Sequence, residues 1–285
     1  MEQPIIANKK VTKYILQRFN IHMSKHLGQN FLIDNNIVEG IVEAANIEAT
    51  DRVLEIGPGI GTLTQALAKT GASITCVELD KRLPEVLAHT LEAYDNVTII
   101  QGDILKVNIP EIMGDKPFKV VANLPYYITT PIIMALLEKH LPITDIVVMV
   151  QKEVAQRMVA EPGSKTYGAL SVAVQYYTEP EIILDVPPSS FMPKPEVDSL
   201  VIDCKVRQTP PVDLIDQKLF FRVVKAGFGQ RRKTLNNALK TLGIDKQIIA
   251  TALSEANIDP TRRGETLSIE EFATLSNLLA DNKNN

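Results

Sequence analysis

The chain has 285 residues, of which 45% are hydrophobic and 22% are charged, a balance typical of globular proteins that bury a sizeable core. The formal net charge is −4, which by itself argues against a polyanion partner. The two cysteines, Cys76 and Cys204, are far apart in the sequence, so neither a disulfide framework nor a metal site is predicted.

The N-terminal segment MEQPIIANKK has no apolar core of the kind found in secretion signals. The longest unbroken apolar run covers residues 146–150, which is far shorter than a membrane span. We therefore expect a cytoplasmic protein that has no membrane partner.

Short β-rich runs alternate with helix-like stretches between residues 52 and 150. Strands are expected at 52–56, 73–79, 97–101, 118–123 and 145–150, and helices at 62–70, 82–94 and 131–140. This alternation predicts βαβ units and a mainly parallel sheet with helices on both faces. Residues 182–206 look like late strands that are interrupted by a proline-rich loop.

The paired prolines Pro210 and Pro211 mark a domain boundary, because proline lacks an amide donor and disfavours helix on its N-terminal side. Helices are expected beyond it, at residues 214–228, 233–241, 246–256 and 269–279. The sequence therefore predicts an α/β domain over residues 1–206 and a small helical domain over residues 207–285.

Three glycines, Gly57, Gly59 and Gly61, follow the first predicted strand, where they let the backbone turn tightly and approach a ligand. The spacing G-x-G-x-G departs from the dinucleotide fingerprint, which has its third glycine one position later. Glu55 stands just before the loop, where it would sit poorly beside a pyrophosphate. Both features favour a nucleoside ligand that has no phosphates.

Two further acidic residues follow the next two predicted strands. Glu78 is placed to accept hydrogen bonds from ribose hydroxyls, and Asp103 is placed to accept one from an adenine amine. A glycine loop, a ribose acid, an adenine acid and an acid for a cationic tail together describe S-adenosylmethionine. Taken alone, Glu78 or Asp103 would be interpreted as a solvated carboxylate at the end of a strand, with no role in binding a cofactor.

The tetrapeptide Asn123-Leu124-Pro125-Tyr126 ends the strand predicted at 118–123. The Asn123 side-chain oxygen and the Leu124 carbonyl can accept the two hydrogens of an adenine amine, which directs the nitrogen lone pair toward the methyl group. Pro125 fixes the turn, and Tyr126 can stack on a base that has been unstacked from its nucleic acid. Catalysis would then consist mainly of positioning, with no covalent intermediate and no metal.

Six motifs, in this order, resemble those of the ribosomal RNA adenine dimethyltransferases. They are GQNFLID at 28–34, LEIGPGIGTLT at 54–64, ELD at 78–80, GDIL at 102–105, NLPYYI at 123–128 and FMPKPEVDS at 191–199. GFGQRRKTLNNAL at 227–239 and RRGETLSIEEF at 262–272 resemble the bacterial small-subunit branch, the KsgA/RsmA type. The resemblance covers nearly the whole chain.

The resemblance implies a Rossmann-like class I S-adenosylmethionine-dependent methyltransferase fold with a small all-α C-terminal domain. It implies dimethylation of two adjacent adenosines in the 3′-terminal hairpin loop of 16S ribosomal RNA in the 30S particle, with a role in small-subunit biogenesis. It also implies that Phe191 stacks on the target base opposite Tyr126. The cofactor residues that it implies, together with the loop glycine, are Asn30, Leu32, Gly57, Gly59, Glu78, Asp103 and Asn123.

Positive charge is concentrated in two regions. Residues 205–240 carry nine basic residues against two acidic ones, and within them Arg231, Arg232 and Lys233 are candidates for phosphate contacts. The second group is near the N-terminus and consists of Lys9, Lys10, Lys13, Arg18 and Lys25. A charge run is normally a solvated face, but the two groups together favour an RNA surface.

Two alternative functions stay open. One is a 23S ribosomal RNA adenine methyltransferase of the macrolide-resistance type, although the net negative charge and the segment at 227–239 argue against it. The other is a ribosome-assembly factor that mainly binds. A monomer is expected, since no exposed heptad or apolar interface is apparent.

Overall fold

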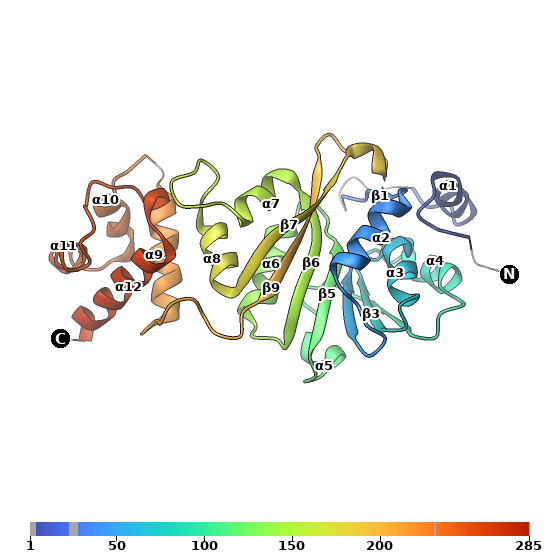
Figure 1. Ribbon diagram of the computed structural model, residues 1–285, viewed down its shortest axis with the longest axis horizontal. Helices are drawn as coiled ribbons and strands as arrows, with labels where there is room; N and C mark the ends of the chain where they lie inside the picture. The colour runs from blue at the N-terminus through green and yellow to red at the C-terminus, as the bar shows by residue number, and fades with distance from the viewer. Residues whose placement is uncertain (1–3, 23–27, 231, 285) are drawn as a thin grey trace. The chain divides into compact units, whose positions relative to one another are not determined.

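The computed structural model describes residues 4–22, 28–230 and 232–284, and the chain forms two compact units (Figure 1). The first unit comprises Met1–Ala155 and Glu179–Val206, and the second comprises Gln156–Thr178 and Arg207–Asn285. This division differs from the predicted boundary in one segment, Gln156–Thr178, which belongs with the C-terminal helices. The reason is apolar packing, since Tyr167 and Tyr176 are buried in one cluster with Phe220.

A seven-stranded sheet, mostly parallel, forms the centre of the first unit and confirms the predicted α/β class (Figure 1). Its strands follow the order β4-β3-β2-β5-β6-β9-β7, in which β9 runs antiparallel to β6. The bounds are β2 (Arg52–Ile56), β3 (Ser73–Glu78), β4 (Val97–Gln101), β5 (Phe118–Asn123), β6 (Ile143–Gln151), β7 (Thr178–Val186) and β9 (Ser199–Val206). A separate two-stranded sheet pairs β1 (Phe31–Leu32) with β8 (Phe191–Met192).

Six helices accompany these strands in the described part of the first unit: α1 (Lys9–Arg18), α2 (Asn35–Ala44), α3 (Thr62–Ala68), α4 (Leu83–Thr90), α5 (Ile109–Met113) and α6 (Thr129–Glu138). Apolar residues at helical spacing in α2 place Ile37, Val38 and Ile41 on one buried face. That face packs with Leu67 of α3 and with sheet residues such as Val53. Helix burial therefore fixes α3, and with it the glycine loop that precedes it.

The second unit is helical around one core that includes Phe220, Leu235 and Phe272. Helix α7 (Lys152–Met158) spans the boundary between the units. The other elements are α8 (Ala169–Tyr177), α9 (Gln217–Gly229), α10 (Leu235–Leu239), η3 (Lys240–Leu242), α11 (Lys246–Glu255), η4 (Gly264–Thr266) and α12 (Ile269–Asn284). No helix among the described residues is both long enough and apolar enough to cross a membrane.

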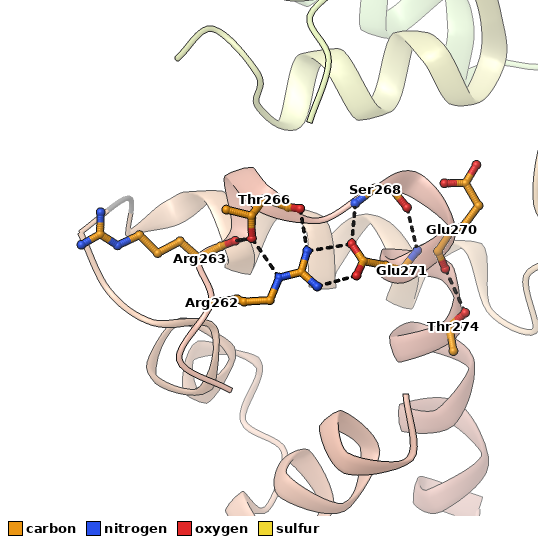
Figure 2. Close-up of polar contacts among 7 residues, drawn as sticks. All are labelled: Arg262, Arg263, Thr266, Ser268, Glu270, Glu271 and Thr274. Carbon is orange, nitrogen blue, oxygen red and sulfur yellow. Dashed lines mark hydrogen bonds and ion pairs between the residues drawn. The ribbon is translucent and has the colours of Figure 1, made fainter. Parts of the chain in front are cut away.

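An ion-pair network holds the start of α12 (Figure 2). Glu271 accepts a hydrogen bond from the Ser268 amide at 2.9 Å, and Ser268 Oγ accepts one from the Glu271 amide at 3.2 Å, which makes a capping box. Arg262 Nη2 donates to Glu271 Oε2 at 2.9 Å, while Nη1 donates to Oε1. These hydrogen bonds hold the pKa of the Glu271 carboxyl below its ordinary value.

Two backbones cross closely in the second unit at Gly264 and Gly227. A Cβ atom on Gly264 would lie 2.4 Å from the Gly227 carbonyl oxygen. A side chain larger than hydrogen therefore has no room at Gly264.

Candidate active site

A cavity opens at the carboxyl ends of the parallel strands in the first unit. The loop after β2, the end of β3, the turn after β4 and the end of β5 all contribute to its lining. Residues 28–32 line it from the N-terminal segment. Ligands in open α/β folds bind at this edge of the sheet, so the position alone marks a candidate binding site.

The glycine loop has the left-handed backbone that its sequence predicts. Gly57, Gly59 and Gly61 have φ values of 70°, 62° and 90°. The Gly59 amide donates a hydrogen bond to Glu78 Oε2 at 3.1 Å, so the loop is joined directly to the end of β3. A Cβ atom on Gly59 would lie 3.1 Å from the Phe31 ring, and the glycine is therefore needed for close packing as well as for its φ angle.

Glu78 is held by two backbone amides at the end of β3. Besides the Gly59 contact, its Oε1 accepts a hydrogen bond from the Asp80 amide at 2.8 Å. The residue is 5% exposed, and burial raises the pKa of its carboxyl above the ordinary value. Each carboxylate oxygen keeps a further acceptor site, so Glu78 is oriented for hydroxyl groups of a ligand.

Glu55 lies at the base of the cavity on β2, opposite Cys76 in the register of β2 and β3. It is 1% exposed, and its Oε2 accepts a hydrogen bond from the Cys76 thiol at 3.4 Å. Burial, with a smaller contribution from the charge of Glu78, raises the pKa of Glu55 to about 7. Among the described residues, no cation forms an ion pair with this carboxyl.

The remaining predicted cofactor residues also line the cavity. Asp103 follows β4, and its Oδ1 accepts a hydrogen bond from the Leu105 amide at 3.1 Å. Asn30 and Leu32 come from the segment that contains β1. The structure therefore brings together every residue that the sequence predicted for the cofactor.

Asn123 ends β5, and its Nδ2 donates a hydrogen bond to the Asn30 carbonyl at 3.2 Å. This contact leaves its amide oxygen to accept from a ligand. The Leu124 amide donates to the Met149 carbonyl at 3.1 Å, which ties the next peptide to β6. The Tyr126 hydroxyl lies 2.6 Å from Ser199 Oγ on β9, and this hydrogen bond fixes the orientation of the tyrosine ring.

Phe191, which was predicted to stack on the target base, is a buried residue of β8. It pairs with Leu32 in the two-stranded sheet, is 3% exposed and packs in the core cluster that contains Val38. It does not belong to the described residues that line the cavity. Strand pairing with β1 therefore places this side chain in a core cluster, and the stacking of Phe191 on a base opposite Tyr126 stays a prediction.

The predicted RNA-binding residues belong to the second unit. Arg232 and Lys233 are exposed in the connection between α9 and α10. Arg231 lies outside the described residues, as does Lys25 of the N-terminal basic group. Within the described residues, no group of three His, Cys, Asp or Glu side chains could hold a metal ion.

A set of contacts beside the cavity involves Gln29, Asp80 and Arg82, for which the sequence predicted no role. Gln29 Nε2 donates to Asp80 Oδ2 at 2.7 Å, and Arg82 Nε donates to Asp80 Oδ1 at 2.9 Å. The Arg82 hydrogen bonds hold the pKa of the Asp80 carboxyl below its usual value. The motifs GQNFLID and ELD contain Gln29, Phe31 and Asp80, and were therefore the available signal.

Comparison with known proteins shows close relatives over nearly the whole length. The Ribosomal RNA small subunit methyltransferase A of Clostridioides difficile (strain 630) is 52% identical over 279 residues, which cover 96% of each chain. The protein of the same name from Bacillus pumilus (strain SAFR-032) is 53% identical over 283 residues, which cover 96% of this chain and 97% of the relative.

Two solved structures are also similar. A dimethyladenosine transferase from Plasmodium falciparum has a TM-score of 0.75 at 27% identity, with 89% of this chain and 98% of that chain covered. The 23S rRNA methyltransferase ErmE has a TM-score of 0.69 at 26% identity, with 88% and 100% covered. Residues 18–281 match the family described as Ribosomal RNA adenine dimethylase. With its cavity, its motifs and its relatives in agreement, this chain belongs to the ribosomal RNA adenine dimethylase family.

Proposed function

We propose that this chain transfers methyl groups from S-adenosylmethionine to the 6-amino groups of two adjacent adenosines in the 3′-terminal hairpin loop of 16S ribosomal RNA. The observation that supports this proposal most strongly is that the glycine loop, Glu78 and Asp103 line the same cavity as the Asn123 to Tyr126 tetrapeptide. The names of the relatives at about half identity support the small subunit as the source of the RNA.

The residues of the cavity fit a nucleoside with a cationic amino acid tail. Glu78 is fixed by two amides and would accept from the ribose hydroxyls, while Asp103 would accept from the adenine amine. Glu55, a buried carboxyl facing the cavity, would receive the cationic end. When bound, S-adenosylmethionine supplies a methyl group on a positively charged sulfur.

The tetrapeptide would orient the amine of the target adenine. The Asn123 amide is held by its contact with the Asn30 carbonyl, and the Leu124 peptide is held by its contact with Met149. The Asn123 side-chain oxygen and the Leu124 carbonyl would each accept one amine hydrogen. This arrangement points the nitrogen lone pair at the methyl group, so the rate gain comes from positioning.

Tyr126 would stack on the base, which must leave its RNA stack to enter the cavity. Its hydroxyl contact with Ser199 fixes the ring before the base arrives. We further propose that the substrate is the 30S particle or its precursor, that the chain acts as a cytoplasmic monomer, and that it takes part in small-subunit biogenesis.

The test is radiolabelled methyl transfer from S-adenosylmethionine to 30S particles that lack the modification, followed by nucleoside analysis. Fifty-fold excesses of 50S particles, free 23S RNA and DNA serve as competitors. We expect dimethyladenosine on the small subunit that no competitor suppresses. Label on 23S RNA would move the activity to the resistance-type reaction, and cofactor binding without any label would favour an assembly factor.

A further inference from the structure

Helix α1 has two faces of different character. Its buried face carries Thr12, Ile15 and Leu16. Its exposed face, here called the basic face, consists of Lys9, Lys10, Lys13, Tyr14, Gln17 and Arg18. Because residues four apart lie one above the other on a helix, Lys10, Tyr14 and Arg18 form one row and Lys9, Lys13 and Gln17 form the row beside it.

The charged residues of the basic face all carry the same sign. Helix α1 contains no acidic residue, and within the described residues no carboxylate forms an ion pair with its four cations. Lys9 and Lys13 are like charges at a spacing of four, which disfavours a helix. Lys9 and Lys10 also stand in the first turn, where the helix dipole favours anions. Both features oppose helix stability, so they indicate a surface suited to an anionic partner.

The helix is fixed to the wall of the candidate active site. Ile15 and Leu16 pack in one cluster with Phe31 and Leu83, two residues that line the cavity. The segment before α1 is tied to α3, because the Ile6 amide donates to Gln65 Oε1 at 3.0 Å. Thr12 Oγ1 donates to the Ile6 carbonyl at 3.0 Å. The basic face therefore keeps a set position relative to the cavity.

We propose that the basic face of α1 is an RNA-binding surface, which holds phosphates of the substrate RNA next to the cavity. The inference rests on the proposed function for the identity of the RNA. Two rows of cations on a rigid helix match the backbone of a nucleic acid strand, whereas the whole chain, with net charge −4, repels it. The cations thus make this side of the first unit a favourable place for RNA phosphates.

Tyr14 adds an aromatic surface to the rows of charge. It is 57% exposed, and its hydroxyl accepts a hydrogen bond from Arg18 Nη1 at 3.1 Å. An exposed ring among cations can stack on an unpaired base, a combination typical of single-stranded nucleic acid contacts. A membrane surface would also attract the cations, but the exposed face presents no aliphatic residue that could enter the lipid.

The test uses two full-length variants that lose the same charge. One is Lys9→Gln, Lys10→Gln, Lys13→Gln on the basic face. The control is Lys69→Gln, Lys116→Gln, Lys139→Gln, which removes three exposed lysines from the opposite, amino-terminal edge of the sheet. Affinity for 30S particles is measured by filter binding between about 50 and 300 mM salt, beside affinity for S-adenosylmethionine, methyl transfer, and binding to vesicles of phosphatidylserine and phosphatidylcholine.

We expect the basic-face variant to bind 30S particles about 10 to 100 times more weakly at the lowest salt, with a log–log salt slope reduced by about 2 to 3. Its cofactor affinity stays at the wild-type value, and the control variant retains both affinities and the slope. The binding assay does not depend on methyl transfer. Its result can therefore be interpreted even if the proposed reaction does not occur. Equal slopes for the two variants, or a loss confined to vesicle binding, would overturn the inference.

Discussion

One site in each unit offers a contrast between an unpaired and a paired carboxylate, and between an open and a packed glycine. The first unit leaves the Glu55 carboxyl without a cationic partner, and nothing lies within 4 Å of the position that a Cβ atom on Gly57 would take. The second unit pairs Arg262 with Glu271 and fills the space above Gly264 with the backbone of Gly227. The space at Gly57 and the unpaired Glu55 carboxyl indicate a place for a ligand, while the close packing at Gly264 and the Arg262–Glu271 pair contribute to stability.

Exchanging glycine for alanine should separate the two cases most strongly. Gly264→Ala forces a methyl group against the Gly227 backbone, so we expect a loss of about 3 kcal/mol or more in the free energy of unfolding. Gly57→Ala meets no neighbour and carries only the strain of its φ of 70°, about 1 kcal/mol. Urea unfolding measures both. Equal losses would contradict the assignment of Gly264 to packing.

Glu55→Gln tests the unpaired charge. Because burial raises the Glu55 pKa to about 7 from 4.5, the native state holds a proton that the unfolded state releases between these values. The free energy of unfolding therefore falls as pH rises from about 4.5 to 7, by up to about 3 kcal/mol. We expect the free energy of unfolding of the glutamine variant to lack this fall. At about pH 8 the variant should therefore unfold at a higher urea concentration than the wild type.

Glu55→Gln should also change the pH dependence of ligand binding, which we expect to run opposite to that of stability. A cationic tail beside Glu55 favours its ionised form, so wild-type affinity for S-adenosylmethionine should rise between about pH 6 and 8. Calorimetric titration with S-adenosylmethionine at several pH values measures this rise in affinity. Asp103→Asn is the control, since it should weaken binding at another part of the cavity and keep the wild-type pH dependence. A glutamine variant with the wild-type pH dependence would contradict the assignment of the cationic end to Glu55.

The Arg262 and Glu271 pair should show the smallest effect of the three. Glu271→Ala removes the ion pair and half of the capping box, and we expect a loss of about 1 to 2 kcal/mol in the free energy of unfolding. Since the Glu271 pKa is lowered, this contribution is complete above about pH 4.5 and is lost as pH falls through the lowered value. A double-mutant cycle with Arg262→Ala isolates the pair, and additive losses would contradict coupling.

Local patterns predicted the parts of the fold whose signal is contiguous. The expected strands at 52–56, 97–101 and 118–123 match β2, β4 and β5, because each is a short run rich in apolar and β-branched residues. Gly57, Glu78, Asp103 and Asn123 were found because each ends or follows a strand, and parallel topology brings strand ends to one edge. Asn30 and Leu32 were predicted from the family resemblance alone. Helices α1, α2, α5, α7 and α8 were not assigned. In α1 and α2 the apolar positions are mixed with exposed polar and charged residues, α5 is short, α7 directly follows β6, and α8 is rich in valine and tyrosine, which also favour strands.

Two features of the fold depend on packing between segments that are far apart in the sequence, and local patterns did not predict them. Phe191 becomes buried only because β8 pairs with β1, about 160 residues earlier in the chain. The segment Gln156–Thr178 joins the second unit because its tyrosines pack on α9, which follows the predicted boundary. No local pattern near either segment records such a partner.

The most direct test of the proposed methyl transfer is Asn123→Ala, measured with 30S particles and S-adenosylmethionine in single-turnover methyl transfer and in particle binding. We expect a rate lower by about 1,000-fold, because the amine loses an acceptor that orients it, and an unchanged affinity for the particle. Asn96→Ala, which removes an amide that bonds to backbone carbonyls at the other edge of the sheet, controls for general damage. Methyl transfer within tenfold of the wild-type rate, or loss of particle binding together with methylation, would contradict the role given to Asn123.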